Sequence, residues 1–172
     1  MPQPSHAVAV ARMPDPAKTE VYLGLGANLA DPRDQVLRAM QELTELLSDY
    51  RASPLYRTRP VGPVAQPDFI NAVVCGYTTL APDALLDHCQ ALERRHGRER
   101  TIHWGPRTLD VDILYYGNVH LNSARLQIPH PEALRRGFVM IPLLTLRPNG
   151  ETPTGDPINR SRYDDAGLEL LA

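Results

Sequence analysis

The chain has 172 residues, of which 42% are hydrophobic and 22% are charged, so it is long enough to bury the core of about one domain. Its formal net charge of −2 disfavours general binding to nucleic acid, which usually needs a basic surface. No run of residues approaches the roughly 18 apolar residues of a transmembrane helix, so we expect no contact with membranes.

The N-terminal residues differ in composition from the rest of the chain. They are rich in proline and alanine, show no periodicity, and lack the apolar core of a signal peptide. We therefore expect residues 1–19 to form a flexible tail and residues 20–172 to form a single domain.

The two cysteines indicate the redox state of the cellular compartment. Cys75 and Cys89 both lie within apolar patterns, where buried free thiols are the expected state. Unpaired thiols indicate a reducing environment, so we expect the protein to be cytoplasmic.

The first half of the chain reads as a strand, a helix and two more strands. Glu20–Gly26 is an apolar run that ends in glycine. Asp31 as N-cap and Pro32 at the first helical position predict the start of a helix, whose apolar spacing continues to about Asp49. The next predicted strands are Tyr50–Arg57 and Phe69–Thr78, separated by a proline-rich loop.

The second half begins with a helix that starts at Pro82 and ends near Gly97. A basic loop follows. The remaining predicted elements are a strand at Leu109–Tyr116, a short strand at Leu126–Ile128, a short helix at Pro131–Arg136 and a final buried strand at Phe138–Leu146. We expect the polar stretch from Asn149 to cover the surface. This order predicts an α+β fold: a ferredoxin-like two-layer sandwich, with an antiparallel sheet and helices packed on one face.

An acidic pair interrupts the apolar strand at Leu109–Tyr116. Because side chains alternate across a strand, Asp110 and Asp112 point to one face, with Cα atoms about 6.6 Å apart. Leu109, Val111 and Ile113 then point into the core. Two carboxylates on one face repel each other unless a cation lies between them, and a hard divalent cation is the natural partner. A solvated strand face is the alternative interpretation.

Basic residues surround the acidic pair in the sequence. They are Arg98, Arg100, Arg107, Arg125, His130, Arg135 and Arg136. Charges of this kind usually mark a solvated surface, but beside an acidic metal pair they suit the binding of polyphosphate. The chain has no P-loop sequence, and GLGAN at Gly24–Asn28 reads as an ordinary turn from strand to helix.

Several motifs together resemble the 6-hydroxymethyl-7,8-dihydropterin pyrophosphokinases of folate biosynthesis, from about Val21 to about Pro148. They are LGLGANL (Leu23–Leu29), YRTRPVGPVAQPDFIN (Tyr56–Asn71), ERRHGRER (Glu93–Arg100), WGPRTLDVDI (Trp104–Ile113) and IPHPEALRRGFVMIPL (Ile128–Leu143). The resemblance implies transfer of pyrophosphate from ATP to the hydroxymethyl group of the pterin, with release of AMP. It also implies a monomer whose partners are these two small molecules.

The resemblance implies a role for each matching position. Asp110 and Asp112 would bind two magnesium ions, and Arg98 and Arg107 would act with them in catalysis. The pterin would be bound by Thr58, Pro60, Val61, Phe69, Asn71 and Phe138, with the two phenylalanines stacking on its faces. The ATP site would include Gln90, Glu93, Arg100, Trp104, Arg107, Ile113, Arg125, His130 and Arg136.

The chain departs from the family pattern at a few positions. Phe69 stands where a tyrosine is common, which keeps a stacking ring but loses a hydroxyl. Arg59 follows Thr58 where a smaller residue or proline is frequent, and Pro131 follows His130 where an aromatic residue can occur. The loop between Arg100 and Trp104 is short, which could alter the closing of a lid.

Two other classes of function compete with the pyrophosphokinase. One is a non-catalytic module that binds nucleotide or RNA through the arginine-rich loop, although such a module gains nothing from two acids facing its ligand. The other is a carboxylate-pair hydrolase, which needs one acid with a raised pKa and a cleft for carbohydrate. The many arginines lead us to expect no raised pKa in this pair.

Overall fold

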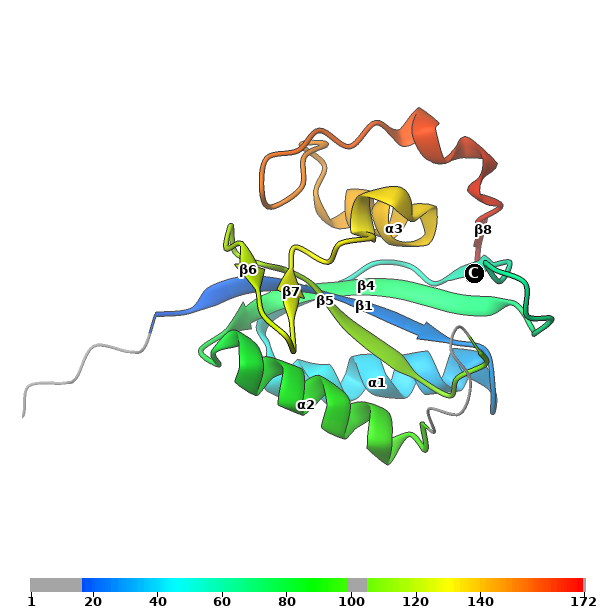
Figure 1. Cartoon of the computed structure of the whole chain (residues 1–172), viewed down its shortest axis with the longest axis horizontal. Coiled ribbons are helices and arrows are strands. Elements are labelled where there is room, and N and C mark those ends of the chain that lie inside the picture. The colour runs from blue at the N-terminus through cyan, green and yellow to red at the C-terminus, as the bar shows by residue number, and fades with distance from the viewer. Residues whose placement is uncertain (1–16, 99–104, 172) are drawn as a thin grey trace, which may run out of the picture.

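The computed structural model describes residues 17–98 and 105–171. A six-stranded sheet forms the middle layer, with strand order β5-β1-β4-β3-β8 and with β2 paired to β4 (Figure 1). Its strands are β1 (Thr19–Ala27), β2 (Ser48–Ala52), β3 (Tyr56–Thr58), β4 (Phe69–Thr78), β5 (Asp110–Tyr116) and β8 (Glu169–Leu170). All of these pairings are antiparallel, as predicted. A two-stranded sheet joins β6 (Leu121–Asn122) to β7 (Gln127–Ile128).

Helix α1 (Pro32–Leu46) begins where the sequence predicts. The side chain of Asp31 accepts a hydrogen bond from the Asp34 N–H at 3.3 Å, and Pro32 occupies the first turn. The helix ends before the expected position at Asp49, because β2 already starts at Ser48 and pairs with β4.

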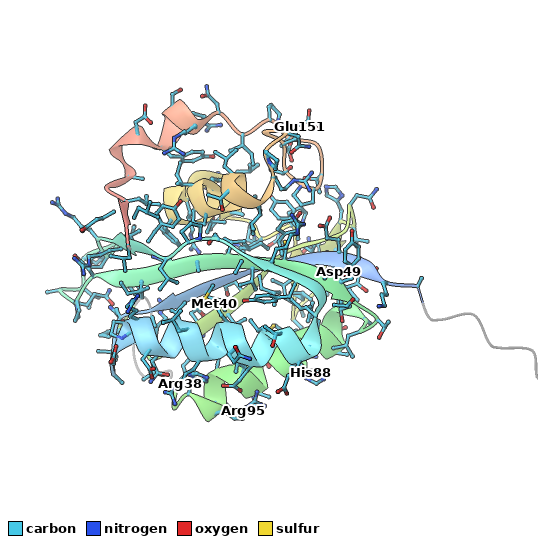
Figure 2. All side chains as sticks on the ribbon, turned by 180° about the vertical axis from the view of Figure 1, so that it is seen from behind. Arg38, Met40, Asp49, His88, Arg95 and Glu151 are labelled. Carbon is cyan, nitrogen blue, oxygen red and sulfur yellow. The ribbon has the colours of Figure 1, made fainter. Side chains whose placement is uncertain are left out.

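Helices α1 and α2 (Pro82–Arg95) cover one face of the sheet (Figure 1). Alternate residues of β1 pack against them in one apolar core, which includes Val21, Leu23, Leu25, Val36, Leu43, Leu85 and Leu92. Figure 2 shows Arg38 and Arg95 on the outer side of these helices, away from the sheet. Both helices are thus amphipathic, and within the described residues no helix is long and apolar enough to cross a membrane.

Helix α3 (Gly137–Leu146) covers the opposite face of the sheet (Figure 1). The prediction of a final strand at Phe138–Leu146 is wrong, because a continuous apolar run has no period that distinguishes a strand from a helix buried on all sides. α3 packs against Tyr22, Cys75 and Tyr115 in a second apolar core. The α+β antiparallel class is confirmed, but helices lie on both faces of the sheet rather than on one.

Shorter segments also differ from expectation. The predicted strand at residues 50–57 is split into β2 and β3 at Ser53 and Pro54, where Ser53 N–H and Oγ bond to the backbone of Val73 at 2.8 and 2.9 Å. The predicted helix at residues 131–136 is a single 3-10 turn, η1 (Ala133–Arg135). The C-terminal stretch forms a second 3-10 helix, η2 (Arg160–Ala166), and then β8, which adds a strand to the sheet.

A matched pair of leucines tests the second core. Leu143 on α3 is 0% exposed, whereas Leu37 on α1 is 43% exposed. We expect Leu143→Ala to lower the free energy of unfolding by about 2–5 kcal/mol, because it leaves a cavity. Leu37→Ala should change it by no more than about 0.5 kcal/mol in the same urea titration. Equal small effects would contradict the assignment of α3 as a core helix.

Candidate functional site

Glycine and aspartate face each other across the pairing of β1 with β5. Gly24 lies opposite Asp112, and Gly26 lies opposite Asp110. A Cβ at Gly26 would lie 3.0 Å from the Asn71 Oδ1 atom, so a side chain at this position would press on the Asn71 amide. The glycines leave the sheet face open beside the acids, as glycine inside a strand often indicates. Val111 is 3% exposed in the core, which confirms the predicted alternation along β5.

A pocket of about 420 Å³ opens over this part of the sheet. Both aspartates line it together with two aromatic rings, an amide and arginines that are far apart in the sequence. The predicted site residues in its lining are Thr58, Val61, Phe69, Asn71, Arg107, Asp110, Asp112, Arg136 and Phe138. Pro60 is not part of the lining. The pocket therefore combines most of the predicted pterin site with the acidic pair.

A buried hydrogen bond shapes one side of the pocket. The Asn71 Nδ2 atom donates to the Thr58 Oγ1 atom at 2.7 Å, which joins β4 to β3. Thr58 is 3% exposed and Asn71 is 6% exposed, so the pair is shielded from bulk water. The bond fixes the plane of the amide, whose Oδ1 atom lies next to Gly26.

Each phenylalanine of the pocket has an arginine over its ring. The Arg107 Cζ atom lies 5.5 Å from the centre of the Phe69 ring, and the Arg136 Cζ atom lies 5.6 Å from that of Phe138. Guanidinium groups are flat and cationic, and they favour aromatic faces. The same flat faces suit a flat heterocycle.

Asp110 is surrounded by positive charge. Its Oδ1 atom accepts a hydrogen bond from the Arg98 Nη1 atom at 2.5 Å, and its Oδ2 atom accepts one from the Arg107 Nη1 atom at 2.7 Å. Glu93, 5% exposed, accepts from the same Arg98 nitrogen at 2.5 Å and from the Val111 N–H at 2.9 Å. Burial alone would raise the pKa of Asp110, but the two guanidinium groups outweigh it and lower this pKa below its ordinary value.

Asp112 has the opposite environment. Its side chain lines the pocket, and no hydrogen bond to it is found among the described residues. Burial, followed by the negative charges of Asp110 and Glu93, raises the pKa of Asp112 to about 7, while Arg136 and Arg98 offset only part of this effect. The expectation that the arginines prevent a raised pKa is therefore wrong for Asp112, because their charge is taken up mainly by Asp110.

His130 lies beside Asp112 but outside the pocket lining. Its Nε2 atom is 3.9 Å from the Asp112 Oδ2 atom, and its Nδ1 atom accepts a hydrogen bond from the Glu132 N–H at 3.1 Å. Burial and then the charge of Arg136 lower the pKa of His130. A neutral ring that accepts at Nδ1 carries its proton on Nε2, so this N–H points toward the acid pair.

Other residues expected to bind nucleotide lie away from the pocket lining. Gln90 and Glu93 are on α2, and the side chain of Ile113 packs in the core on the α2 side of the sheet. Arg125 is exposed and pairs with Asp87 at 2.5 Å and with Asp83 at 3.7 Å. Arg100 and Trp104 lie outside the described residues.

Asn28 is a structural residue of the site that the sequence analysis missed. Its Nδ2 atom donates to Gln66 Oε1 and Pro67 O, both at 2.9 Å, and its Oδ1 atom accepts from the Arg107 N–H at 2.9 Å. Asn28 is 2% exposed, so it ties two loops of the pocket to the end of β1. The GLGAN turn thus holds the pocket loops in place as well as joining β1 to α1. The sequence feature that indicates this role is a polar residue directly after a strand that contains two glycines.

The donor set of the acid pair suits magnesium bound together with phosphate. Among the described residues, no group of three or more metal-binding side chains is present. Magnesium is often held by one or two carboxylates, with substrate phosphates and water completing its shell, so two aspartates beside a pocket are sufficient. The raised pKa of Asp112 supports a magnesium site here, because it shows that the carboxylate has too little positive charge around it.

Asparagine at position 112 tests the electrostatics of the acid pair without any ligand. A folded-state pKa of about 7 lies above the ordinary value, so the stability contributed by Asp112 is complete at low pH and is lost as the pH rises to about 7. In a buffer with chelator, we expect Asp112→Asn to raise Tm above that of the wild type at pH 8 and to leave it almost unchanged at pH 4. Glu45→Gln, which removes an exposed carboxylate elsewhere on the chain, is the control. A lower Tm for Asp112→Asn at pH 8 would contradict the assignment.

Known proteins resemble this chain in sequence and in fold. Residues 22–148 match the family of 7,8-dihydro-6-hydroxymethylpterin-pyrophosphokinase (HPPK). The 2-amino-4-hydroxy-6-hydroxymethyldihydropteridine pyrophosphokinase of Pseudomonas aeruginosa is 46% identical over 138 residues, which are 78% of this chain and 85% of that one. The protein of the same name from Methylorubrum extorquens is 38% identical over 159 residues, covering 89% and 99% of the two chains.

Solved structures agree on the fold. Wild-type HPPK-DHPS of Plasmodium falciparum, crystallised with pterin and p-hydroxybenzoate, aligns with a TM-score of 0.62 at 15% identity and covers 89% of this chain. This chain spans 44% of the length of that protein, and at such low identity the likeness concerns the fold alone. The sequence match over most of the chain decides the family: this chain belongs to the HPPK family.

Proposed function

We infer that the chain transfers a pyrophosphoryl group from ATP to the hydroxymethyl group of 6-hydroxymethyl-7,8-dihydropterin in folate biosynthesis, the reaction of its family. One observation supports this function most directly: the acidic pair and both phenylalanines line the same pocket. A binding module would have no use for the acids, and a carbohydrate hydrolase would have no need of a site for a flat heterocycle.

We assign the acceptor to the side of the pocket formed by Thr58, Phe69, Asn71 and Phe138. A bicyclic ring lies between flat aromatic faces, and its polar edge meets the buried amide of Asn71 and the hydroxyl of Thr58. Val61, 62% exposed, lies at the rim and contributes its backbone, as does Pro60. The arginines now over the phenylalanine rings leave these faces when the pterin enters, and their charge becomes free for phosphate.

We assign the phosphates of ATP to the side that holds the acid pair. Asp110 and Asp112 would hold two magnesium ions. When bound, these ions would supply positive charge that neutralises the transferred group and lowers the pKa of the acceptor hydroxyl. Release of AMP means that the hydroxyl oxygen attacks the β-phosphorus and that the bridging oxygen leaves with AMP.

The arginines and the histidine would act on the same phosphates. Arg98 and Arg107 both bind the carboxylate of Asp110, so their guanidinium groups lie beside the proposed phosphate site. The His130 Nε2 atom lies 3.9 Å from the Asp112 Oδ2 atom, and the charge of Arg136 lowers the pKa of Asp112. These four groups orient the triphosphate and stabilise the charge that develops on the leaving oxygen. Gln90, Glu93, Arg100, Trp104, Ile113 and Arg125 are proposed to complete the nucleotide site.

We further propose that the protein acts in the cytoplasm as a monomer, with residues 20–172 as its single catalytic domain. Cys75 and Cys89 are free and buried, which suits a reducing compartment. Burial raises the pKa of the Cys89 thiol to about 12, so this thiol is unreactive and serves packing.

An assay of AMP release tests the reaction. With ATP and magnesium, we expect AMP to form only when 6-hydroxymethyl-7,8-dihydropterin is present, and a chelator should abolish it. Asp112→Ala should lower turnover by at least roughly 100-fold with an unchanged circular dichroism spectrum, because the metal site loses a ligand. Glu45→Ala, which removes an exposed carboxylate, is the matched control. Turnover at the wild-type level in Asp112→Ala would remove this residue from the mechanism.

A substitution on α3 tests the acceptor site separately. We expect Phe138→Ala to raise the KM for the pterin by roughly 10- to 100-fold, since stacking of a base-like ring is lost. The KM for ATP should stay within about twofold of the wild-type value in the same steady-state assay. Leu144→Ala removes a half-buried side chain of the same helix that does not line the pocket and should change neither constant. Equal losses for both substrates in Phe138→Ala would indicate a packing defect instead.

A further inference from the structure

The C-terminal segment Asn159–Leu171, called here the strap, lies after the residues that match the family, which end at position 148. Figure 1 shows it in red, passing over α3 and then descending to the edge of the sheet at β8. It contains η2 and β8. The strap contacts β3 and the junction between η1 and α3, which are separate in the sequence and which both carry residues of the acceptor pocket.

The first contact is with β3. β8 pairs antiparallel with β3, with Leu170 opposite Tyr56 and Glu169 opposite Arg57, and the Leu171 N–H donates to Leu55 O at 2.9 Å. The next residue of β3 is Thr58, whose hydroxyl accepts the buried hydrogen bond from Asn71. Without β8, β3 would be an edge strand that pairs on one side only.

The second contact is with the junction between η1 and α3. The Tyr163 hydroxyl donates to Leu134 O at 2.6 Å, and Tyr163 is 8% exposed. Leu134 lies within η1, two residues before Arg136. The hydrogen bond thus fixes the backbone that leads into α3, whose second residue is Phe138.

Gly137 shows how closely the strap packs at this junction. A Cβ at Gly137 would lie 2.5 Å from the Ala166 Cβ atom, 3.4 Å from the Tyr163 Cβ atom and 3.5 Å from the Leu168 Cδ1 atom. Glycine is required here by the strap rather than by the backbone, since Gly137 is not among the residues of positive φ. Gly137 separates Arg136 from Phe138, and Ala166 itself lines the pocket.

We propose that the strap is part of the acceptor pocket and that Tyr163 is a positioning residue for Phe138. The strap joins the wall that holds Phe138 to the wall that holds Thr58, so the distance between the two walls depends on it. This inference rests on the proposed acceptor site. Loss of the strap contact therefore weakens the binding of the pterin and leaves the phosphate side intact.

Two kinds of variant test the proposal by steady-state kinetics. Tyr163→Phe removes only the hydroxyl, and we expect the KM for the pterin to rise roughly fivefold while kcat and the KM for ATP stay within about twofold. Tyr77→Phe changes a tyrosine of β4 that is 36% exposed and should leave all three constants unchanged. Gly137→Ala should raise the pterin KM as well, and adding Ala166→Gly should restore it, because the nearest clashing atom is then gone.

Hydrogen exchange, measured on the protein without substrates, tests the contact of the strap independently of the proposed reaction. The amides of residues 134–140 should exchange faster in Tyr163→Phe and Gly137→Ala, and at the wild-type rate in the Gly137→Ala/Ala166→Gly variant. If the wild-type protein forms no pterin-dependent AMP, the proposed function fails. The exchange rates still test whether the strap stabilises residues 134–140. An unchanged pterin KM with unchanged exchange in Tyr163→Phe would overturn the proposal. Equal rises in the KM for the pterin and the KM for ATP in Tyr163→Phe would also overturn it. If Gly137→Ala does not fold, the result for Tyr163→Phe alone decides the test.

Discussion

The alternation of side chains across β1, β4 and β5 is the constraint on which the rest of the structure depends. On one side, these strands present an unbroken apolar surface to α1 and α2. On the other side, each strand changes character along its length, from apolar residues under α3 to glycine, amide and carboxylate at the pocket. A shift of one residue in register would place both aspartates in the core, where unpaired charge is very costly. The dense apolar face therefore holds the acids on the pocket side.

The two carboxylates occupy similar positions but have different electrostatic roles. Asp110 is held ionised by Arg98 and Arg107, and Arg98 also forms an ion pair with Glu93. Asp112 receives little of this positive charge and carries a raised pKa. Such a pair is less favourable for the free protein than for the complex, because a cation would relieve the repulsion between the acids. Functional sites commonly reduce stability in this way, and the remainder of the sheet compensates for it.

Both faces of the sheet must be covered for the pocket to exist. α3 covers the apolar part of the sheet face opposite α1 and α2, and it begins at the pocket, with Arg136 and Phe138 at its N-terminal end. The strap packs on Gly137 and pairs with β3, so it supports the pocket from both sides. A helix that carries site residues on its first turn needs such support, because its own hydrogen bonds begin only one turn later.

Sequence alone determined the features that depend on local pattern. The period of two along β5 placed Asp110 and Asp112 on one face, the cap at Asp31 placed the start of α1, and the motifs identified the family. Only the tertiary structure decided the state of Phe138–Leu146, because an all-apolar run becomes strand or helix according to what surrounds it. The same holds for the pKa of Asp112, which depends on how Arg98 and Arg107 divide their charge between two acids. It holds also for Asn28 and Tyr163, whose partners lie far away in the chain, since contacts between distant residues leave no period in the sequence.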